Sequence, residues 1–284
     1  MTIPGVLSME SIRIEAIPAF RDNYIWMIHD GRHAVVVDPG AAEPVLQTID
    51  QHGLELSAIL LTHLHYDHHF GVPDLVAHRP APVFGPLLND FDRVSHPPFP
   101  RPGTVPIDCV SRVVGEGDTV GIGELGLELS VLAVPGHTKG HIVFLERQRG
   151  WLFTGDTLFA GGCGKVFGGS MQAMIDSLDR LANLPPDTQI YCAHEYTLAN
   201  LGFALAVEPG NAALHERFTA DSRKRELGLP TLPSTIAMER DTNPFLRVME
   251  AEVLEALRTQ RGVAAETRVA SFEALRSWKD QFQD

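Results

Sequence analysis

Four potential metal ligands lie within six positions near residue 65, and they are His63, His65, Asp67 and His68. In extended chain His63 and His65 project to the same face, whereas on a helix residues two apart point to nearly opposite sides. The apolar residues 57–61 just before them predict a short buried strand. The ligands would therefore follow the C-terminal end of that strand, where open α/β sheets place their sites.

Neutral imidazole binds zinc, iron, manganese or nickel, and an added carboxylate fits a hydrolytic or oxygen-activating centre better than a structural one. Because this short segment cannot close a site alone, further ligands must come from elsewhere. Three later segments supply candidates, each after an apolar or β-branched run: His137 with His141, Asp156, and His194. Turns are polar in general, so each of these residues taken singly has an ordinary explanation. Four predicted strand ends that each deliver His or Asp form a constellation.

The elements that would position these side chains change character along the chain. The first two thirds alternate short apolar runs with Gly- and Pro-rich turns, which indicates a layered α/β or α+β domain. Residues 171–184 show helical spacing of apolar side chains, with Ser170 as N-cap and Pro185 as terminator, while residues 80–106 predict a Pro-rich loop. From about residue 196 strand signals nearly vanish. Helices are predicted at residues 197–206, 211–228, 250–260 and 271–281.

Together these motifs resemble the metallo-β-lactamase superfamily and, within it, the glyoxalase II (hydroxyacylglutathione hydrolase) family. The resemblance runs nearly end to end, through THLHYDH at residues 62–68, PGHTKGH at 135–141, GDTLFAGGCGK at 155–165, CAHEYT at 192–197, VEPGNAA at 207–213 and NPFLR at 243–247. It implies an αββα catalytic sandwich over residues 1–194 followed by a smaller helical substrate-binding domain over residues 195–284.

The resemblance also implies a metal centre and a reaction. Two divalent metal ions are implied, zinc foremost, with iron or manganese as alternatives. Carried over by motif, the ligands are His63, His65 and His137 for one ion, Asp67, His68 and His194 for the other, and Asp156 as the bridge. The implied reaction is two-metal hydrolysis of S-2-hydroxyacylglutathione, chiefly S-D-lactoylglutathione, to glutathione and a 2-hydroxy acid such as D-lactate. Asp67 and Asp156 would be the catalytic carboxylates, since Asp67 could also orient the attacking hydroxide or take its proton.

Candidate substrate contacts lie mostly in the C-terminal part. Arg276 and Lys279, three residues apart, would share one face of a predicted helix. Spacing alone favours a solvated basic face, but the resemblance implies that this pair, with Lys165 and Tyr196, binds the carboxylate end of glutathione. Phe167 stands where many relatives have tyrosine, so it keeps the ring but lacks a donor, a loss worth about 0.5–1.5 kcal/mol.

Two further histidines lie beside the proposed ligands. His69 occupies a position where relatives usually have a small residue, and we expect its ring to point away from the metals, with a supporting hydrogen bond as the alternative. His141 follows a proposed ligand by four residues and is the stronger candidate for such a supporting hydrogen bond.

Other functions share parts of this pattern. A mononuclear-iron persulfide dioxygenase of the same superfamily would use His63, His137 and Asp156, but its relatives lack the long helical segment with R-x-x-K. A non-catalytic glutathione-conjugate binding protein would have no need of all seven ligand types.

The composition of the chain limits the classes of partner that it can bind. With 23 basic and 36 acidic residues among 284, the net charge of −13 argues against nucleic acid and gives little attraction to an anionic membrane. Cys109, Cys163 and Cys192 show no CxxC spacing and predict reduced thiols. No secretory signal is visible at the N-terminus, so we expect a cytoplasmic protein, acting as a monomer on a small-molecule thioester.

Overall fold

The computed structural model describes residues 12–87, 109–167 and 169–282, so most of the predicted loop at 80–106 lies outside the described residues. The strands are β1 (Arg13–Ala19), β2 (Asn23–His29), β3 (His33–Val37), β4 (Glu55–Leu60), β5 (Val83–Gly85), β6 (Arg112–Val113), β7 (Thr119–Ile122), β8 (Leu127–Ala133), β9 (Ile142–Glu146), β10 (Trp151–Gly155), β11 (Leu158–Phe159), β12 (Gly162–Cys163), β13 (Gln189–Cys192) and β14 (Ser234–Thr235). The α-helices are α1 (Ala42–His52), α2 (Tyr66–His69), α3 (Val72–His78), α4 (Met171–Ala182), α5 (Thr197–Val207), α6 (Ala212–Glu226), α7 (Ile236–Thr242), α8 (Ala251–Arg261) and α9 (Arg268–Gln281).

Two six-stranded mixed sheets form the centre of the molecule. One has the order β1-β2-β3-β4-β5-β6 and the other the order β14-β13-β10-β9-β8-β7. In the first sheet β3, β4, β5 and β6 pair in parallel, so the C-terminal ends of β3 and β4 meet at one edge. In the second sheet β10 and β13 are parallel and likewise deliver their ends together.

Three apolar cores separate the layers. Residues between the sheets, among them Trp26, Phe144 and Phe153, form one core. The outer face of the first sheet packs on α1 and α3 through Val45, Ile49 and related side chains. The outer face of the second sheet packs on α4 and the C-terminal helices. This arrangement is the αββα sandwich expected from the sequence, and burial of apolar area in these cores is its main stabilising term.

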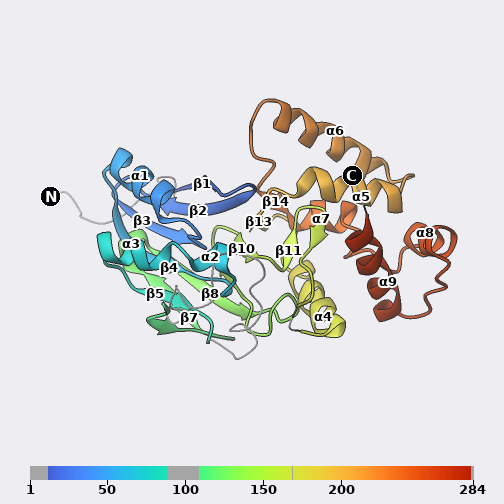
Figure 1. The fold of residues 1–284 in the computed structure, drawn as a ribbon, viewed down its shortest axis with the longest axis horizontal. Helices are drawn as coiled ribbons and strands as arrows, with labels where there is room; N and C mark the ends of the chain where they lie inside the picture. Colours follow the sequence, from blue (N-terminus) through green and yellow to red (C-terminus); the bar gives the residue numbers. More distant parts are fainter. Residues whose placement is uncertain (1–11, 88–108, 168, 283–284) are drawn as a thin grey trace.

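The C-terminal helices gather at the end of the molecule away from the N-terminus (Figure 1). The predicted helices correspond to α5, α6, α8 and α9, and α4 begins at the predicted cap, where the Ser170 hydroxyl accepts from the Ala173 N–H. The short helix α7 and strand β14 were not predicted. Strand β14 pairs with β13 and extends the second sheet, so part of the region after residue 194 belongs to the sandwich.

Within the described ranges, no helix is both long and apolar enough to cross a membrane.

Candidate metal centre

The proposed ligands converge because their strands end at the same edge of the sandwich. The segment with His63, His65, Asp67 and His68 follows β4, and α2 turns the last two of these back toward the sheet edge. His137 lies in the β8–β9 connection, and Asp156 directly follows β10. His194 follows β13 and pairs with Asn23 in an isolated antiparallel β-bridge. All seven proposed ligands therefore come from four strand ends, as the sequence predicts.

Two compact groups of ligand atoms result. His63, His65 and His137 form the first group, and Asp67, His68 and His194 form the second, with the ligand atoms of each group within 4.8 Å of one another. In the first group Nε2 of His137 lies 2.9 Å from Nδ1 of His65. In the second group Nε2 of His194 lies 3.4 Å, and Nε2 of His68 3.5 Å, from Oδ2 of Asp67.

Asp156 stands between the groups. Its Oδ1 lies 3.3 Å from Nε2 of His194 and 3.5 Å from Nε2 of His68, while its Oδ2 lies 3.5 Å from Nε2 of His137. The two carboxylate oxygens thus face different groups. These N···O distances are longer than an ordinary N–H···O hydrogen bond. They leave room for one ion between Oδ1 and the second group and for another between Oδ2 and the first group.

The donors fit bound cations. Nε2 of His63 is buried and makes no hydrogen bond to any residue that the structure describes, which is costly for a ring nitrogen unless a ligand occupies it. Burial lowers the pKa of His65 to about 3, so this ring is neutral and able to donate a lone pair. Burial also lowers the pKa of His68, but Asp67 and Asp156 outweigh that effect and raise it to about 10. The carboxylates of Asp67 and Asp156 thus favour positive charge at the second group, which is the charge that a metal ion would supply.

Asp38 links the two groups through hydrogen bonds to His68 and, by way of Thr62, to His63, and no sequence motif predicted this role. It is buried just after β3, and its carboxylate accepts from the Thr62 N–H at 2.8 Å, the Thr62 hydroxyl at 2.7 Å and Nδ1 of His68 at 3.1 Å. Because the Thr62 hydroxyl donates to Asp38, it accepts from Nδ1 of His63, 3.1 Å away. One carboxylate therefore holds both His63 and His68 with Nε2 directed to the centre. Asp38, His63 and His68 also lie close enough to form a third ligand group, but these hydrogen bonds already use the Asp38 oxygens.

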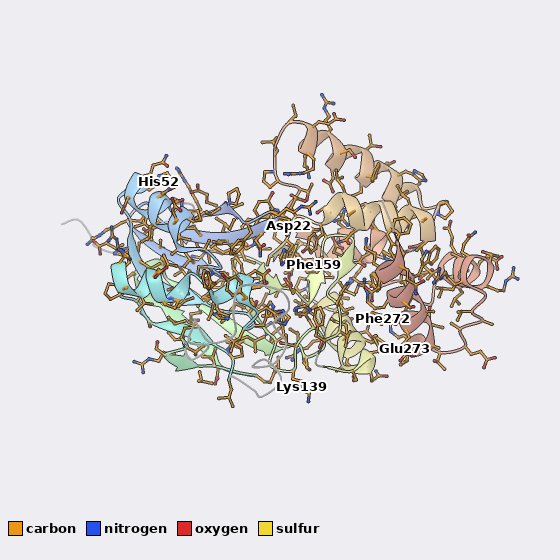
Figure 2. The ribbon with its side chains drawn as sticks, in the orientation of Figure 1. Asp22, His52, Lys139, Phe159, Phe272 and Glu273 are labelled. Atoms are coloured by element: carbon orange, nitrogen blue, oxygen red, sulfur yellow. The ribbon has the colours of Figure 1, made fainter. Side chains whose placement is uncertain are left out.

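Other residues support the remaining ligands. Nδ1 of His194 lies 2.9 Å from Oδ1 of Asp22, and Nδ2 of Asn23 donates to Oδ2 of Asp67 at 3.0 Å. Asp22 lies near the middle of the molecule in Figure 2, between the sandwich and the C-terminal helices. Asp22 lies in the β1–β2 turn and Asn23 begins β2, and none of the sequence motifs predicted these supporting contacts.

His137 is held from the opposite side, where its Nδ1 donates to the Lys165 carbonyl at 2.8 Å. His141 takes the supporting position expected for it: its Nε2 accepts from the Asp156 N–H at 3.1 Å and its ring stacks on that of His63. His69 is buried in α2.

The proposed substrate residues surround this centre unevenly. The Phe167 ring is half exposed and contacts the His65 and His137 rings. The Tyr196 ring stacks on His194 at 4.7 Å, and burial raises its pKa to about 12, so its hydroxyl stays protonated at neutral pH.

The basic side chains differ in accessibility. Lys165 is more than half exposed and lies 3.8 Å from Asp280. Arg276 is buried and donates to the Cys163 carbonyl at 3.1 Å and to Asp280 at 2.8 Å, while Lys279 donates to the Ala199 carbonyl at 2.9 Å. Arg276 and Lys165 therefore meet at one acidic side chain, and the Arg276 guanidinium has much of its donor capacity engaged inside the protein.

The cysteines fit the expectation of reduced thiols. All three are free, and burial raises the pKa of Cys163 to about 11 and that of Cys192 to about 12. Neither residue takes part in the ligand groups found among the described residues.

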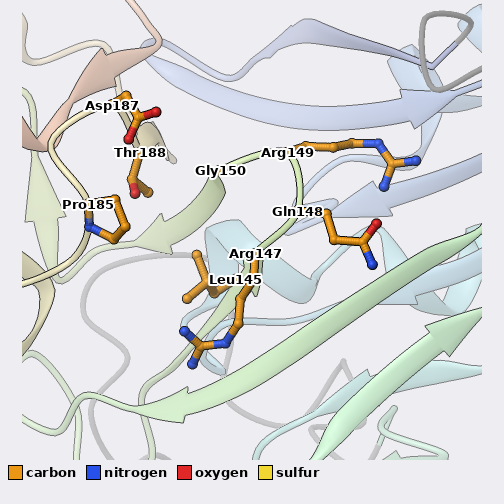
Figure 3. A pocket seen from close by; sticks show the side chains of 8 residues that line it. All are labelled: Leu145, Arg147, Gln148, Arg149, Gly150, Pro185, Asp187 and Thr188. Atoms are coloured by element: carbon orange, nitrogen blue, oxygen red, sulfur yellow. The ribbon is translucent and has the colours of Figure 1, made fainter.

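A cleft elsewhere on the sandwich is a poor alternative site. The β9–β10 turn and residues 185–188 line it, and Figure 3 shows Arg147 and Arg149 pointing in different directions there. None of the proposed ligands lines this cleft.

This fold and paired ligand groups match a known class. The family model described as the metallo-beta-lactamase superfamily covers residues 19–194, so the chain belongs to that superfamily. ETHE1 from Myxococcus xanthus is 25% identical with a TM-score of 0.59, and the match covers 94% of this chain and 99% of that one. TTHA1623, solved in a di-iron-bound form, is 27% identical with a TM-score of 0.56, and the match covers 82% of this chain and 100% of that one.

The C-terminal part identifies the branch. Residues 195–282 match the model described as hydroxyacylglutathione hydrolase C-terminus. Hydroxyacylglutathione hydrolases from Cupriavidus metallidurans and Cupriavidus taiwanensis are 46% and 49% identical, each match covering 96% of this chain and 100% of the relative. The chain belongs to the hydroxyacylglutathione hydrolase family. The superfamily and the His/Asp groups together indicate binding of two divalent metal ions.

Proposed function

We propose that this chain hydrolyses S-2-hydroxyacylglutathione, chiefly S-D-lactoylglutathione, to glutathione and a 2-hydroxy acid such as D-lactate. The observation that supports it most strongly is the combination of two ligand groups with Asp156 between them and a C-terminal region of the hydroxyacylglutathione hydrolase type. In a cell, this reaction would complete the detoxification of methylglyoxal. We also propose that residues 1–194 form the catalytic domain and residues 195–284 the substrate-binding domain of a cytoplasmic monomer.

For the metals, we propose zinc foremost, with iron or manganese able to replace it, because the same imidazole and carboxylate ligands suit all three. His63, His65 and His137 would hold one ion, Asp67, His68 and His194 the other, and Asp156 would bridge them. When bound, such a pair lowers the pKa of a water toward neutrality and polarises the acyl carbonyl that the water attacks.

The chain's own side chains would orient the reactants. Asp67 is fixed by a hydrogen bond from Asn23. Although burial opposes it, His68 and His194 hold the pKa of Asp67 well below the usual range, so the carboxylate stays ionised and can accept a hydrogen bond from the attacking water. The Tyr196 hydroxyl would donate a hydrogen bond to the glutathione moiety, and the exposed ring of Phe167 would cover the thioester. Lys165, Arg276 and Lys279 would form a local cationic region for the glutathione carboxylates on an otherwise acidic protein.

The direct test combines metal analysis with turnover on one purified sample. We expect two divalent ions per chain and hydrolysis of S-D-lactoylglutathione that is lost on chelation and restored by metal. Iron-dependent oxygen consumption with glutathione persulfide, without thioester hydrolysis, would instead identify a dioxygenase. Tight binding of glutathione conjugates with neither activity would identify a binding protein.

Replacement of Lys165 tests glutathione recognition, because this exposed side chain can be removed with little effect on the fold. We expect Lys165→Ala to raise KM for S-D-lactoylglutathione by about 10- to 150-fold, since a charge-assisted contact is worth roughly 1.5–3 kcal/mol. Because Lys165 would bind the substrate equally well in the ground state and in the transition state, kcat should change little. A small thioester without the glutathione carboxylates is the matched control, and equal losses on both substrates would contradict the assignment.

Phe167→Tyr tests the departure from relatives that have tyrosine here. The half-exposed ring has room for a hydroxyl, which would supply the missing donor and lower KM for S-D-lactoylglutathione by up to about tenfold, the equivalent of about 0.5–1.5 kcal/mol. Phe167→Leu removes the ring and should raise KM. If tyrosine and phenylalanine give equal KM values, no hydroxyl contact is made at this position.

A further inference from the structure

The chain between Asp156 and Lys165 touches the metal centre at both ends. Asp156 begins it and faces both ligand groups. Lys165 ends it and supplies the carbonyl that accepts from His137. Between them the chain forms the β11–β12 hairpin and folds back so tightly that a Cβ on Gly164 would lie 2.0 Å from the Asp156 carbonyl oxygen. A shift of this hairpin would therefore move two contacts of the centre together.

Side chains from the C-terminal region bind the backbone of this hairpin. Each comes from a different part of that region: Asn200 in α5, Glu239 in α7, Asn243 just after α7, and Arg276 in α9. Asn200 donates to the Ala160 carbonyl at 3.0 Å, and Glu239 accepts from the Gly161 N–H at 2.8 Å. Asn243 donates to the Phe159 and Gly162 carbonyls at 3.3 and 2.9 Å. Arg276 donates to the Cys163 carbonyl at 3.1 Å. Phe159 lies in Figure 2 where the sandwich meets the helices.

Asn243 and Glu239 are the most deeply buried of these four side chains, both with no exposed surface. Nδ2 of Asn243 also donates to Oε2 of Glu239 at 2.9 Å, and Oδ1 of Asn243 accepts from the Phe245 N–H at 3.0 Å. Oε1 of Glu239 accepts from Arg217 at 2.7 Å, which compensates its charge. A buried amide or carboxylate that lost these partners would carry a large desolvation cost, so the pair is held firmly against the hairpin.

Two glycines allow this close contact. Gly161 has φ +69°, and a Cβ there would lie 2.9 Å from Cδ2 of Leu201, while a Cβ on Gly162 would lie 2.7 Å from Nδ2 of Asn200. Glycine adopts the positive φ of Gly161 without strain, and a side chain at either position would have to displace the Leu201 or Asn200 side chain. Gly161 and Gly162 of the 155–165 motif and Asn243 of the NPFLR motif thus belong to the same contact, between the β11–β12 hairpin and the C-terminal region.

We propose that Asn243, together with Glu239, is a positioning residue that fixes the β11–β12 hairpin against the C-terminal region and so sets the places of Asp156 and Lys165 at the metal centre. The C-terminal region would then contribute to the geometry of the centre as well as to substrate binding. The consequence for turnover rests on the proposed function, whereas the effect on the hairpin does not.

The test compares Asn243→Ala with Thr242→Val in the full-length protein with its metals. Thr242 is the adjacent buried residue and accepts from Arg217, yet it makes no contact with the hairpin among the hydrogen bonds found. Hydrogen exchange of residues 157–165 should accelerate at least tenfold in Asn243→Ala and stay unchanged in Thr242→Val, before and after chelation. Equal exchange in the two variants would overturn the proposal.

Metal retention gives a second readout that general destabilisation does not imitate. In competition with a chelator, Asn243→Ala should release metal at least tenfold more readily than Thr242→Val when the two have equal melting temperatures. If Asn243→Ala fails to fold, Asn243→Ser keeps a shorter donor and should show the same effects more weakly. If hairpin exchange is faster in Asn243→Ala but the unmodified protein has no thioesterase activity, the positioning role of Asn243 stands and the proposed function is wrong. If exchange is unchanged and the protein is fully active, the proposed function stands and the positioning role is wrong.

Discussion

Asp156→Ala should abolish most of the activity and part of the metal binding. The carboxylate is the one proposed ligand with an oxygen facing each group, at 3.3–3.5 Å from the His194, His68 and His137 nitrogens. Without it, two cations would lie close together with less negative charge between them. We expect fewer than two ions per chain and a fall in kcat/KM of at least about 100-fold, equivalent to about 2.7 kcal/mol.

Metal analysis and steady-state kinetics measure this result on the same preparation. Asp156→Asn is the matched variant because it keeps the shape and one carbonyl oxygen, and it should retain more metal than Asp156→Ala. Two tightly held ions and normal turnover in Asp156→Ala would show that Asp156 is no bridge, and the two-metal arrangement would need other ligands.

Asp38→Asn should weaken both halves of the centre at once. Asn tolerates the left-handed conformation of this residue, φ +53°, so the backbone should survive the change. The new amide nitrogen cannot accept hydrogen bonds, so either the Thr62 N–H loses its acceptor, or the Thr62 hydroxyl and His68 both lose theirs. Loss of a residue that orients a ligand typically costs about 10- to 100-fold in metal affinity or activity, and we expect that range for chelator competition here.

Asp30→Asn is the control for Asp38→Asn. Asp30 also accepts from two backbone N–H groups, at 2.8 and 2.7 Å, but it lies in the β2–β3 turn away from the ligands. The Asp30→Asn variant should have lower thermal stability and unchanged metal affinity. If Asp38→Asn lowered stability alone in the same way, Asp38 would act on the fold and not on the orientation of His63 and His68.

Local pattern explains why so much of this protein was predictable. Side chains alternate along a strand, so His63 and His65 had to share a face, and apolar runs before Asp156 and His194 marked the strands that β10 and β13 confirm. Helix α4 shows helical spacing of its apolar residues, and the side chains of Ser170, Asn211 and Thr267 cap the N-termini of α4, α6 and α9. Helix α7 and strand β14 are short and lie between Pro233 and Pro244, and their local signal is weak. Tertiary contacts outweigh it: β14 pairs with β13, and Glu239 of α7 accepts hydrogen bonds from Arg217 and the Gly161 N–H.

The sequence by itself determined which residues carry ligand chemistry, because imidazole and carboxylate side chains and their short spacings are written in the chain. The tertiary structure alone decided which supporting groups meet them. Asp38 lies 30 positions before His68, and Asn243 lies 81 positions beyond Gly162, yet each pair is joined by a hydrogen bond. Such contacts depend on how sheets and helices pack, and a polar residue becomes a support for the site only when burial removes water as its competing partner.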